Sequence, residues 1–352
     1  MSNKIIFKCL AGSRAYGTNI ETSDTDTRGC FIAPPTKILS CFESIEQIED
    51  KKNDEVIYEF SKLVKLLAEN NPNILEMLYT PKENIIFIDP LYQQLIDNRH
   101  LFVSKKCMHT FSGYGFAQLK RIKSHCKWIN NPKDEKRPEI ADFCKFIGLD
   151  GVVIKDRNEL EKMGQNSFLV ETFGSTQFRV FQSNEFFKEK LGFFSKDQIN
   201  LKYVDIKNEI LANKANFIGF FWCNIEEFEK QTTEWNQYWN WKNNRNKVRA
   251  ELEEKMNFDG KHALHLMRLL KMCKEILSTG EILVKRPDRD FLLDIRNGKY
   301  TYDEVLKMAE DLENECKELY NTTSLPYGPN YQEIDKLYRE ILFGYWKSEN
   351  MI

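Results

Sequence analysis

Two aspartates near the N-terminus, Asp24 and Asp26, have the spacing in this chain that most clearly indicates chemistry. Side chains two residues apart on an extended strand point to the same face, so we expect the two carboxylates side by side. Like charges at such close range disfavour each other unless a cation lies between them. Because Mg²⁺ takes oxygen ligands and keeps sites open for phosphates, the pair predicts a magnesium site.

Gly12 and Ser13 precede the aspartates and supply the second half of the motif. A glycine after a buried strand lets the backbone turn sharply and approach a triphosphate. The Ser13 hydroxyl, the backbone N–H groups and the start of the following helix can bind phosphate oxygens, and Arg14 can add a charge-assisted contact. We therefore predict that Gly12, Ser13 and Arg14 bind a nucleotide.

Short apolar strands must position these residues. Residues 4–11 and 28–33 predict buried strands on either side of the motif, and 54–58 predicts a third before a helix at 60–69. Two aspartates with a third carboxylate from a neighbouring strand can hold two Mg²⁺ ions, with Mn²⁺ as the alternative. Such ions steady the attacking oxygen and the leaving group of an in-line displacement. The order of strands and motif favours this interpretation over a solvated turn.

The rest of the chain predicts an α+β protein. Helices are expected over 90–130, a polar linker over 130–140, aromatic-rich strands between 167 and 222, and helices again from 223 to about 320. We therefore expect a catalytic domain of a sheet and flanking helices at 1–130. A linker and β-rich insertion would follow at 131–222, and a helical C-terminal domain at 223–352.

Composition narrows the class of protein. The 352 residues are 41% hydrophobic and 30% charged, with a net charge of −2, so nucleic-acid binding would need a local basic patch. Nine scattered cysteines without a CxxC pair argue against zinc knuckles and redox pairs. No apolar run approaches the roughly 20 residues of a membrane span. With no signal-peptide pattern at the start, we expect a cytoplasmic protein with reduced thiols.

The motif resembles the signature of the polymerase-β nucleotidyltransferase superfamily, and the fuller pattern resembles its RNA-repair-pathway DNA polymerase beta family. The matching residues and segments are 12–19, 23–29, Lys62, 71–78, 113–121, Arg245, Asn246, Arg249 and 258–270. The resemblance implies the fold and metal-dependent nucleotidyl transfer, with Asp24 and Asp26 as catalytic metal ligands. It also implies a third carboxylate eight residues before Lys62, which is Asp54; Glu59 and then Glu55 are the alternatives.

A later helix carries a second group of polar residues. Lys261, His265 and Arg268 share one helical face, which predicts a positive surface directed at nucleotide phosphates. A solvated face with a satisfied histidine is the alternative. His262 and His265 are three apart and could hold zinc, but the sequence offers no evident third ligand.

Three functions fit these observations. The first is addition of a nucleotide from a nucleoside triphosphate to an RNA or DNA end. The second is nucleotidyl transfer to a protein or small molecule, which the near-neutral net charge favours. The third is a non-catalytic nucleotide-binding regulator, which the intact Asp-x-Asp pair disfavours. Base, acceptor and oligomeric state are not specified by the sequence.

Overall fold

A computed structural model describes residues 3–43, 45–164, 167–171, 176–182, 216–245 and 247–352. The chain divides into two compact units, residues 1–130 with 247–352 and residues 131–246. The second unit therefore interrupts the first along the sequence. The predicted boundary between 222 and 223 falls inside this second unit, and residues 183–215 of the predicted insertion lie outside the described residues.

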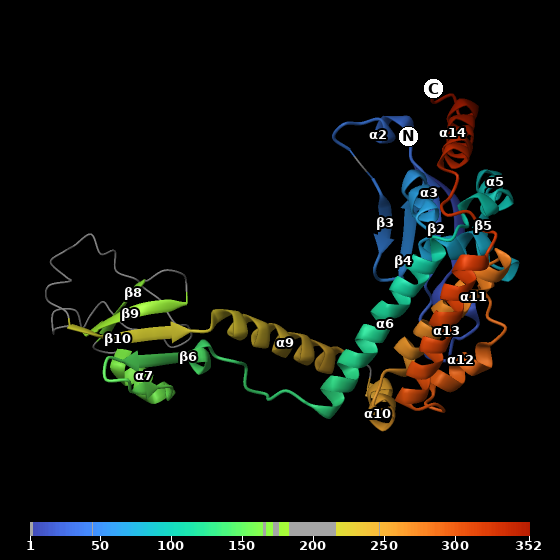
Figure 1. Cartoon of the computed structure of the whole chain (residues 1–352). Helices are drawn as coiled ribbons and strands as arrows, with labels where there is room; N and C mark the ends of the chain where they lie inside the picture. Colours follow the sequence, from blue (N-terminus) through green and yellow to red (C-terminus); the bar gives the residue numbers. More distant parts are fainter. Residues whose placement is uncertain (1–2, 44, 165–166, 172–175, 183–215, 246) are drawn as a thin grey trace. The chain divides into compact units, whose positions relative to one another are not determined.

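The first unit contains a mixed five-stranded sheet in the order β3-β4-β2-β1-β5 (Figure 1). Strands β2 and β4 are parallel, and the other neighbours are antiparallel. The three strands expected from the sequence are present, and β3 and β5 extend the sheet at its two edges. The strands span Lys4–Leu10 (β1), Thr27–Ile32 (β2), Gln47–Asp50 (β3), Glu55–Glu59 (β4) and Ile85–Ile88 (β5).

Helices from both halves of the sequence complete this unit, and α6, α11 and α13 lie side by side (Figure 1). The N-terminal helices are Gly12–Tyr16 (α1), Pro35–Ile38 (α2), Phe60–Ala68 (α3), Pro72–Leu75 (α4), Pro90–Asp97 (α5) and Cys107–Asn130 (α6). The C-terminal helices are Lys247–Met256 (α10), Gly260–Thr279 (α11), Arg289–Arg296 (α12), Tyr302–Thr322 (α13) and Tyr331–Ser348 (α14). Short 3₁₀ turns occupy Glu76–Tyr79 (η1), Lys82–Asn84 (η2) and Arg99–Phe102 (η3).

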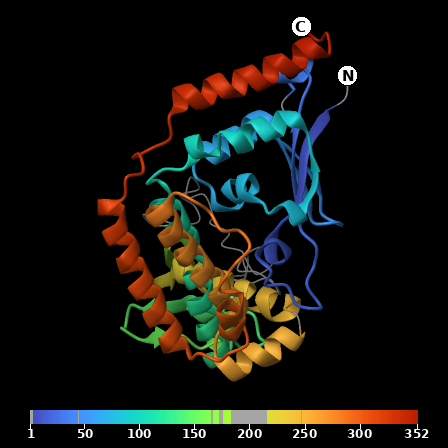
Figure 2. The same cartoon turned by 90° about the vertical axis from the view of Figure 1, so that its right-hand side faces the viewer.

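One apolar core joins the sheet to these helices. Phe7 of β1 stacks on Tyr92 of α5 with ring centroids 4.0 Å apart, and both are fully buried. Trp346 of α14 is buried and its indole donates a hydrogen bond to the Ala33 carbonyl after β2. Figure 2 shows α14, in red, running beside α3 and α5. Each such side chain contributes roughly 1.5–3 kcal/mol of burial free energy, so the C-terminal helices stabilise the sheet that carries the motif.

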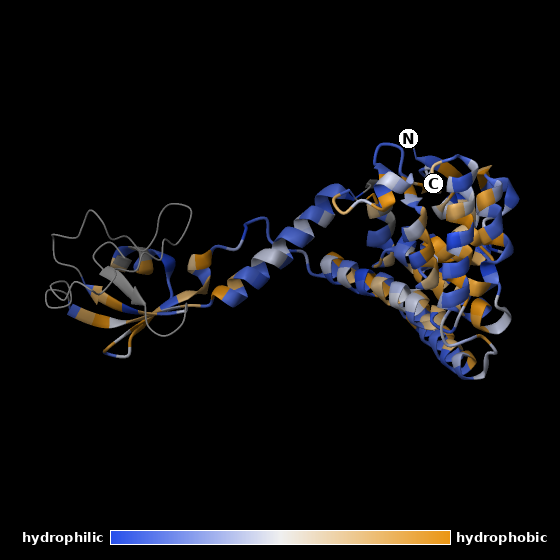
Figure 3. Cartoon of the chain, turned by 90° about the horizontal axis from the view of Figure 1, so that it is seen from above, coloured by the Kyte–Doolittle hydropathy of each residue, from blue (hydrophilic) through white to orange (hydrophobic). Residues whose placement is uncertain are grey.

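The amphipathic pattern expected of these helices is visible in Figure 3, where orange and blue stretches alternate along them. Helix α11 is the exception, since most of its length is buried. A helix that is buried on most sides keeps polar side chains only where they are paired. The partners of the polar residues on α11 therefore help to identify their function.

The second unit holds another five-stranded sheet, in the order β7-β6-β10-β9-β8. Helix α9 belongs to the same unit: its Trp235 and Trp239 indoles donate to the Asp134 carbonyl in the loop after α6, and Phe228 packs edge-on against Phe143. The expected β-rich insertion is thus present and includes this helix. Its elements are Ile140–Phe143 (η4), Cys144–Gly148 (β6), Val153–Ile154 (β7), Arg157–Gly164 (α7), Ser167–Glu171 (β8), Gln177–Gln182 (β9), Asn216–Cys223 (β10) and Ile225–Asn244 (α9).

The α+β class predicted from the sequence is confirmed, with a sheet and helices followed by a mainly helical C-terminal region. All nine cysteines are free thiols. Within the described ranges, none of the helices combines the length and apolar character needed to cross a bilayer.

Candidate nucleotidyl-transfer site

The two halves of the motif meet where β1 ends and β2 begins. The Ala11 N–H donates to the Asp26 carbonyl at 2.9 Å, which ties the end of β1 to the residue before β2. Gly12 has a φ of +60°, a left-handed conformation that favours glycine. A Cβ at residue 12 would lie 2.2 Å from Asp26 Oδ2. Glycine is therefore required here because the Asp26 carboxylate packs against its Cα.

Asp24 and Asp26 lie in the segment that leads into β2, since the strand itself begins at Thr27. This corrects the expectation that both are strand residues. The parallel register pairs Thr27 with Glu55, and the Thr27 N–H donates to the Asp54 carbonyl at 3.1 Å. One residue earlier on both segments, Asp26 and Asp54 are neighbours in the backbone, and the charge of Asp54 acts on Asp26. Their role as metal ligands together with Asp24 stays a prediction.

The pKa of Asp26 is raised above its ordinary value. Burial is the largest cause, and the negative charges of Asp24 and Asp54 add to it, while Arg28 and Lys261 partly oppose the shift. The ionised form of Asp26 is thus disfavoured by its own neighbours. A hard divalent cation such as Mg²⁺ would relieve this repulsion between the carboxylate charges.

The alternative third carboxylates lie elsewhere. Glu55 is the first residue of β4, and its carboxylate pairs with Lys8 of β1 at 2.7 Å. Glu59 is paired with Phe31 at the other end of β4 and is buried. Its carboxylate accepts from the Ser61 and Lys62 N–H groups and thereby caps α3. The structure therefore does not place Glu59, a predicted metal ligand, with Asp24 and Asp26.

Arg14 organises the loop before the aspartates. Its guanidinium donates to the carbonyls of Ser23 and Asp24, each at 3.2 Å. These contacts hold the segment that presents the Asp24 carboxylate, whereas the sequence had predicted a direct contact to nucleotide. Arg28, which the sequence analysis did not select, similarly donates to the Thr27 and Asp54 carbonyls and fixes the turn at Asp54.

Lys261 and His265 extend the site from α11. Lys261 is half-buried and its charge acts on Asp26, so it is the member of the predicted positive face that lies nearest to the aspartates. The pKa of His265 is lowered to about 3 by burial and by the charges of Arg268 and Lys261. His265 is therefore a neutral imidazole at pH 7, which corrects its assignment to a positive face.

Arg268 is buried and binds protein groups. Its guanidinium pairs with the Glu76 carboxylate of η1 and lies over the Tyr16 ring at 3.8 Å. The Tyr16 hydroxyl donates to Glu76 at 2.7 Å, and burial raises the pKa of Tyr16 so that it stays protonated. The structure thus corrects the prediction that Arg268 contacts nucleotide phosphates. The signal that was missed is Glu76, a carboxylate inside the apolar run Leu75–Leu78.

Backbone contacts from the C-terminal part hold α1 as well. The Arg286 N–H donates to the Tyr16 carbonyl at 3.0 Å, and the Arg289 side chain donates to the Gly17 carbonyl. Arg286 is itself held by both carboxylate oxygens of Glu275. The turn that carries Gly12 and Ser13 is therefore positioned by residues more than half the chain away.

A mixed five-stranded sheet with Gly-Ser after its first strand and a mainly helical C-terminal region is consistent with a polymerase-β-like fold. Residues 1–131 match the model of the RNA repair pathway DNA polymerase beta family, which confirms the resemblance found in the motifs. This family implies a nucleotidyltransferase of the polymerase-β type.

A relative from Enterobacteria phage T4 is described as an uncharacterized 38.9 kDa protein in the nrdC-mobD intergenic region. It is 23% identical over 335 residues, which cover 88% of this chain and 87% of the phage protein. The similarity therefore includes the C-terminal helices. No solved structure matches the chain.

Proposed function

We propose that this chain transfers a nucleoside monophosphate from a nucleoside triphosphate to a hydroxyl group. The observation that carries the proposal is the group of Asp24, Asp26 and Asp54 beside Gly12, with the pKa of Asp26 raised by burial and by the charges of the other two carboxylates. The hydroxyl oxygen bonds to the α-phosphorus and the bond to the bridging oxygen breaks, which releases pyrophosphate. The hydroxyl proton passes to a carboxylate of the cluster.

Asp24, Asp26 and Asp54 would hold Mg²⁺ or Mn²⁺. When bound, these ions would neutralise the negative charge that develops on the attacking and leaving oxygens. The protein's own part is positioning: Arg14 and Arg28 fix the backbone at Asp24 and Asp54, and Lys261 places a positive charge beside Asp26. Such preorganised charges act on the transition state without rearranging during the reaction.

We propose an RNA or DNA end as the acceptor. The name of the matching family, with its reference to RNA repair, motivates this choice. A local basic surface supports it, because α6 carries exposed Lys120, Lys123 and Lys127 at helical spacing around a shallow groove lined by Phe116 and Leu119. Lysines in a row bind backbone phosphates, and an aromatic side chain among them offers a surface for a base.

The proposal is tested with the full chain, Mg²⁺ and each α-³²P-labelled nucleoside triphosphate in turn. RNA, DNA and total protein are offered as separate acceptors. Label on RNA or DNA supports the proposal, and label confined to protein replaces the acceptor while keeping the reaction. If the protein binds nucleotide but labels none of the acceptors, the proposal is wrong and the chain is a regulator that binds nucleotide without transferring it.

A further inference from the structure

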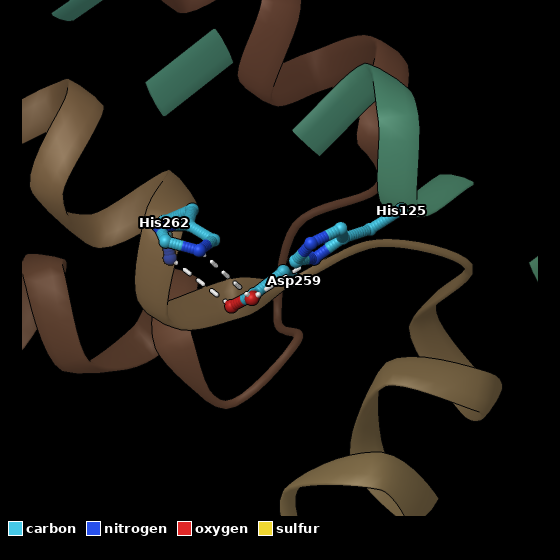
Figure 4. Close-up of side chains that lie close together, drawn as sticks. All are labelled: His125, Asp259 and His262. Carbon is cyan, nitrogen blue, oxygen red and sulfur yellow. Dashed lines mark hydrogen bonds and ion pairs between the residues drawn. The ribbon is translucent and has the colours of Figure 1, made fainter. Parts of the chain in front are cut away.

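Three side chains with metal-binding atoms meet at the start of α11, separate from the aspartate cluster. His125 comes from α6, Asp259 is the residue that caps α11, and His262 lies in the first turn of α11. Their ligand atoms all lie within 4.8 Å of one another. Figure 4 shows the two imidazole rings flanking the Asp259 carboxylate. The third ligand that the sequence did not reveal is thus supplied by tertiary structure, and His265 is not part of the group.

The distances from the Asp259 carboxylate to the two histidine nitrogens are longer than typical hydrogen bonds and fit two ligands of the same metal ion. Asp259 Oδ2 lies 3.3 Å from His125 Nδ1 and 3.4 Å from His262 Nε2. N–H···O hydrogen bonds are usually about 2.7–3.2 Å long. Two ligands at adjacent corners of a tetrahedral Zn²⁺ site, each about 2.0–2.1 Å from the ion, are separated by about 3.3–3.4 Å.

The second ring nitrogen of His262 and the second carboxylate oxygen of Asp259 have hydrogen-bond partners of the kind that orient metal ligands. His262 Nδ1 lies 2.7 Å from Gln118 Oε1, and in the neutral tautomer that donates to this oxygen Nε2 carries the lone pair that a metal would bind. Asp259 Oδ1 accepts from the Lys261 and His262 N–H groups at 2.9 and 3.1 Å, which leaves Oδ2 toward the histidines. Repulsion between that lone pair and the Asp259 carboxylate would be removed by a bound cation or by a proton on the ring. Metal-bound histidines commonly donate their second N–H in this way.

The three side chains are also largely buried, as ligands of a bound metal ion usually are. The Asp259 side chain is 1% exposed, and those of His125 and His262 are 14% and 18% exposed. Two imidazoles and a buried carboxylate form a donor set that suits zinc more than magnesium. The remaining exposure gives an ion access and leaves room for water as a further ligand.

We propose that His125, Asp259 and His262 bind a divalent transition-metal ion, Zn²⁺ foremost, as a second metal site. The ion joins α6 to the first turn of α11 and so fixes the position of Lys261 relative to Asp26. This site goes beyond the proposed nucleotidyl transfer, and its test does not depend on that activity. The alternative without a metal is a protonated histidine paired with Asp259.

The test measures zinc content and affinity of the full chain after removal of metal by a chelator and titration with ZnCl₂. We expect one zinc per chain at these residues and a higher melting temperature with zinc. His125→Gln and His262→Gln are expected to weaken zinc binding at least about 100-fold. His109→Gln is the matched control, because His109 is an exposed histidine on the same helix α6.

A second control separates the two sites. Asp26→Asn removes a carboxylate of the aspartate cluster and is expected to leave zinc affinity unchanged. Co²⁺ titration provides an independent readout, since its visible absorption reports ligand geometry and should change with His262→Gln while circular dichroism shows a folded chain. Zinc binding that survives both histidine substitutions, or that is lost with Asp26→Asn, would overturn the assignment. So would failure of the native chain to bind zinc or cobalt.

Discussion

Gly12 and Asp26 are in direct contact: a Cβ on residue 12 would lie 2.2 Å from Asp26 Oδ2. The contact joins the turn after β1 to the segment before β2, two parts of the motif that are separate in the sequence. It also explains why a glycine occupies position 12, beyond its φ of +60°. The position of the Asp26 carboxylate therefore depends on the absence of a side chain at residue 12.

Gly12→Ala should displace Asp26 and abolish nucleotidyl transfer while the chain stays folded. Gly17→Ala is the matched control, because Gly17 has a similar φ of +72° but its Cβ would meet only the Arg289 side chain at 3.9 Å. Gly17→Ala should cost about 1 kcal/mol of backbone strain and keep activity. Activity assays with urea unfolding of both variants check this. Equal activity losses would show that strain, rather than the contact with Asp26, is responsible.

Asp26→Asn should stabilise the metal-free protein at neutral pH. The raised pKa means that the folded state holds the Asp26 proton more tightly than the unfolded chain, whose pKa is near 3.8. Stability is therefore lost as pH rises from that value through the folded pKa. Asparagine cannot ionise, so the variant should melt at a higher temperature than the native chain at pH 7, and the difference should shrink toward pH 4.

Melting curves in chelator from pH 4 to pH 8 measure this difference. Added Mg²⁺ should raise the melting temperature of the native chain more than that of Asp26→Asn. A variant that is less stable than the native chain throughout this range would contradict the cause assigned to the shift.

Arg268→Met should destabilise the fold by about 3–5 kcal/mol, because it leaves the Glu76 carboxylate buried without its ion-pair partner. The double variant Glu76→Gln with Arg268→Met should recover part of that loss. Lys285→Met is the control, since its pair with Glu83 is solvent-exposed and its removal should have no measurable effect. Denaturant unfolding measures all three. If Arg268→Met is as stable as the native chain and loses nucleotide binding, the sequence-based assignment of Arg268 was right.

Lys120→Ala with Lys123→Ala should weaken binding of a single-stranded acceptor without changing its base preference. Each lost phosphate contact should lower the slope of log affinity against log salt by about 0.7. Lys307→Ala on α13 is the control, because this lysine is also exposed. Fluorescence anisotropy at several salt concentrations gives the slopes. An unchanged slope in the double variant would place the acceptor elsewhere.

Local sequence patterns predicted the strands around the motif, because runs of apolar residues bounded by turn residues are properties of short segments. They also predicted the amphipathic helices. The choice of Asp54 as third carboxylate came from the resemblance to the family. The edge strands β3 and β5 were missed because both are short and largely exposed, without the apolar run that marks a buried strand.

The contacts of the polar side chains on α11 could not be predicted from local sequence patterns. Helical spacing places Lys261, His265 and Arg268 on one face, but only the packing of α11 against η1 and α1 buries Arg268 on Glu76 and Tyr16. Likewise, His125 and His262 are brought together by helix packing. Long-range contacts of this kind leave no periodic signal, although a lone carboxylate such as Glu76 in an apolar run indicates that a buried partner exists.

The rate of pyrophosphate release from a nucleoside triphosphate, with Mg²⁺ and the acceptor that takes up label, tests the central claim most directly. Asp26→Asn and Asp54→Asn should each lower the rate at least about 100-fold. Glu55→Gln, which is next to Asp54 in the sequence but removes a carboxylate paired with Lys8, should keep close to the native rate. Native-like rates for both aspartate variants, or a loss confined to Glu55→Gln, would contradict a reaction centred on Asp24, Asp26 and Asp54.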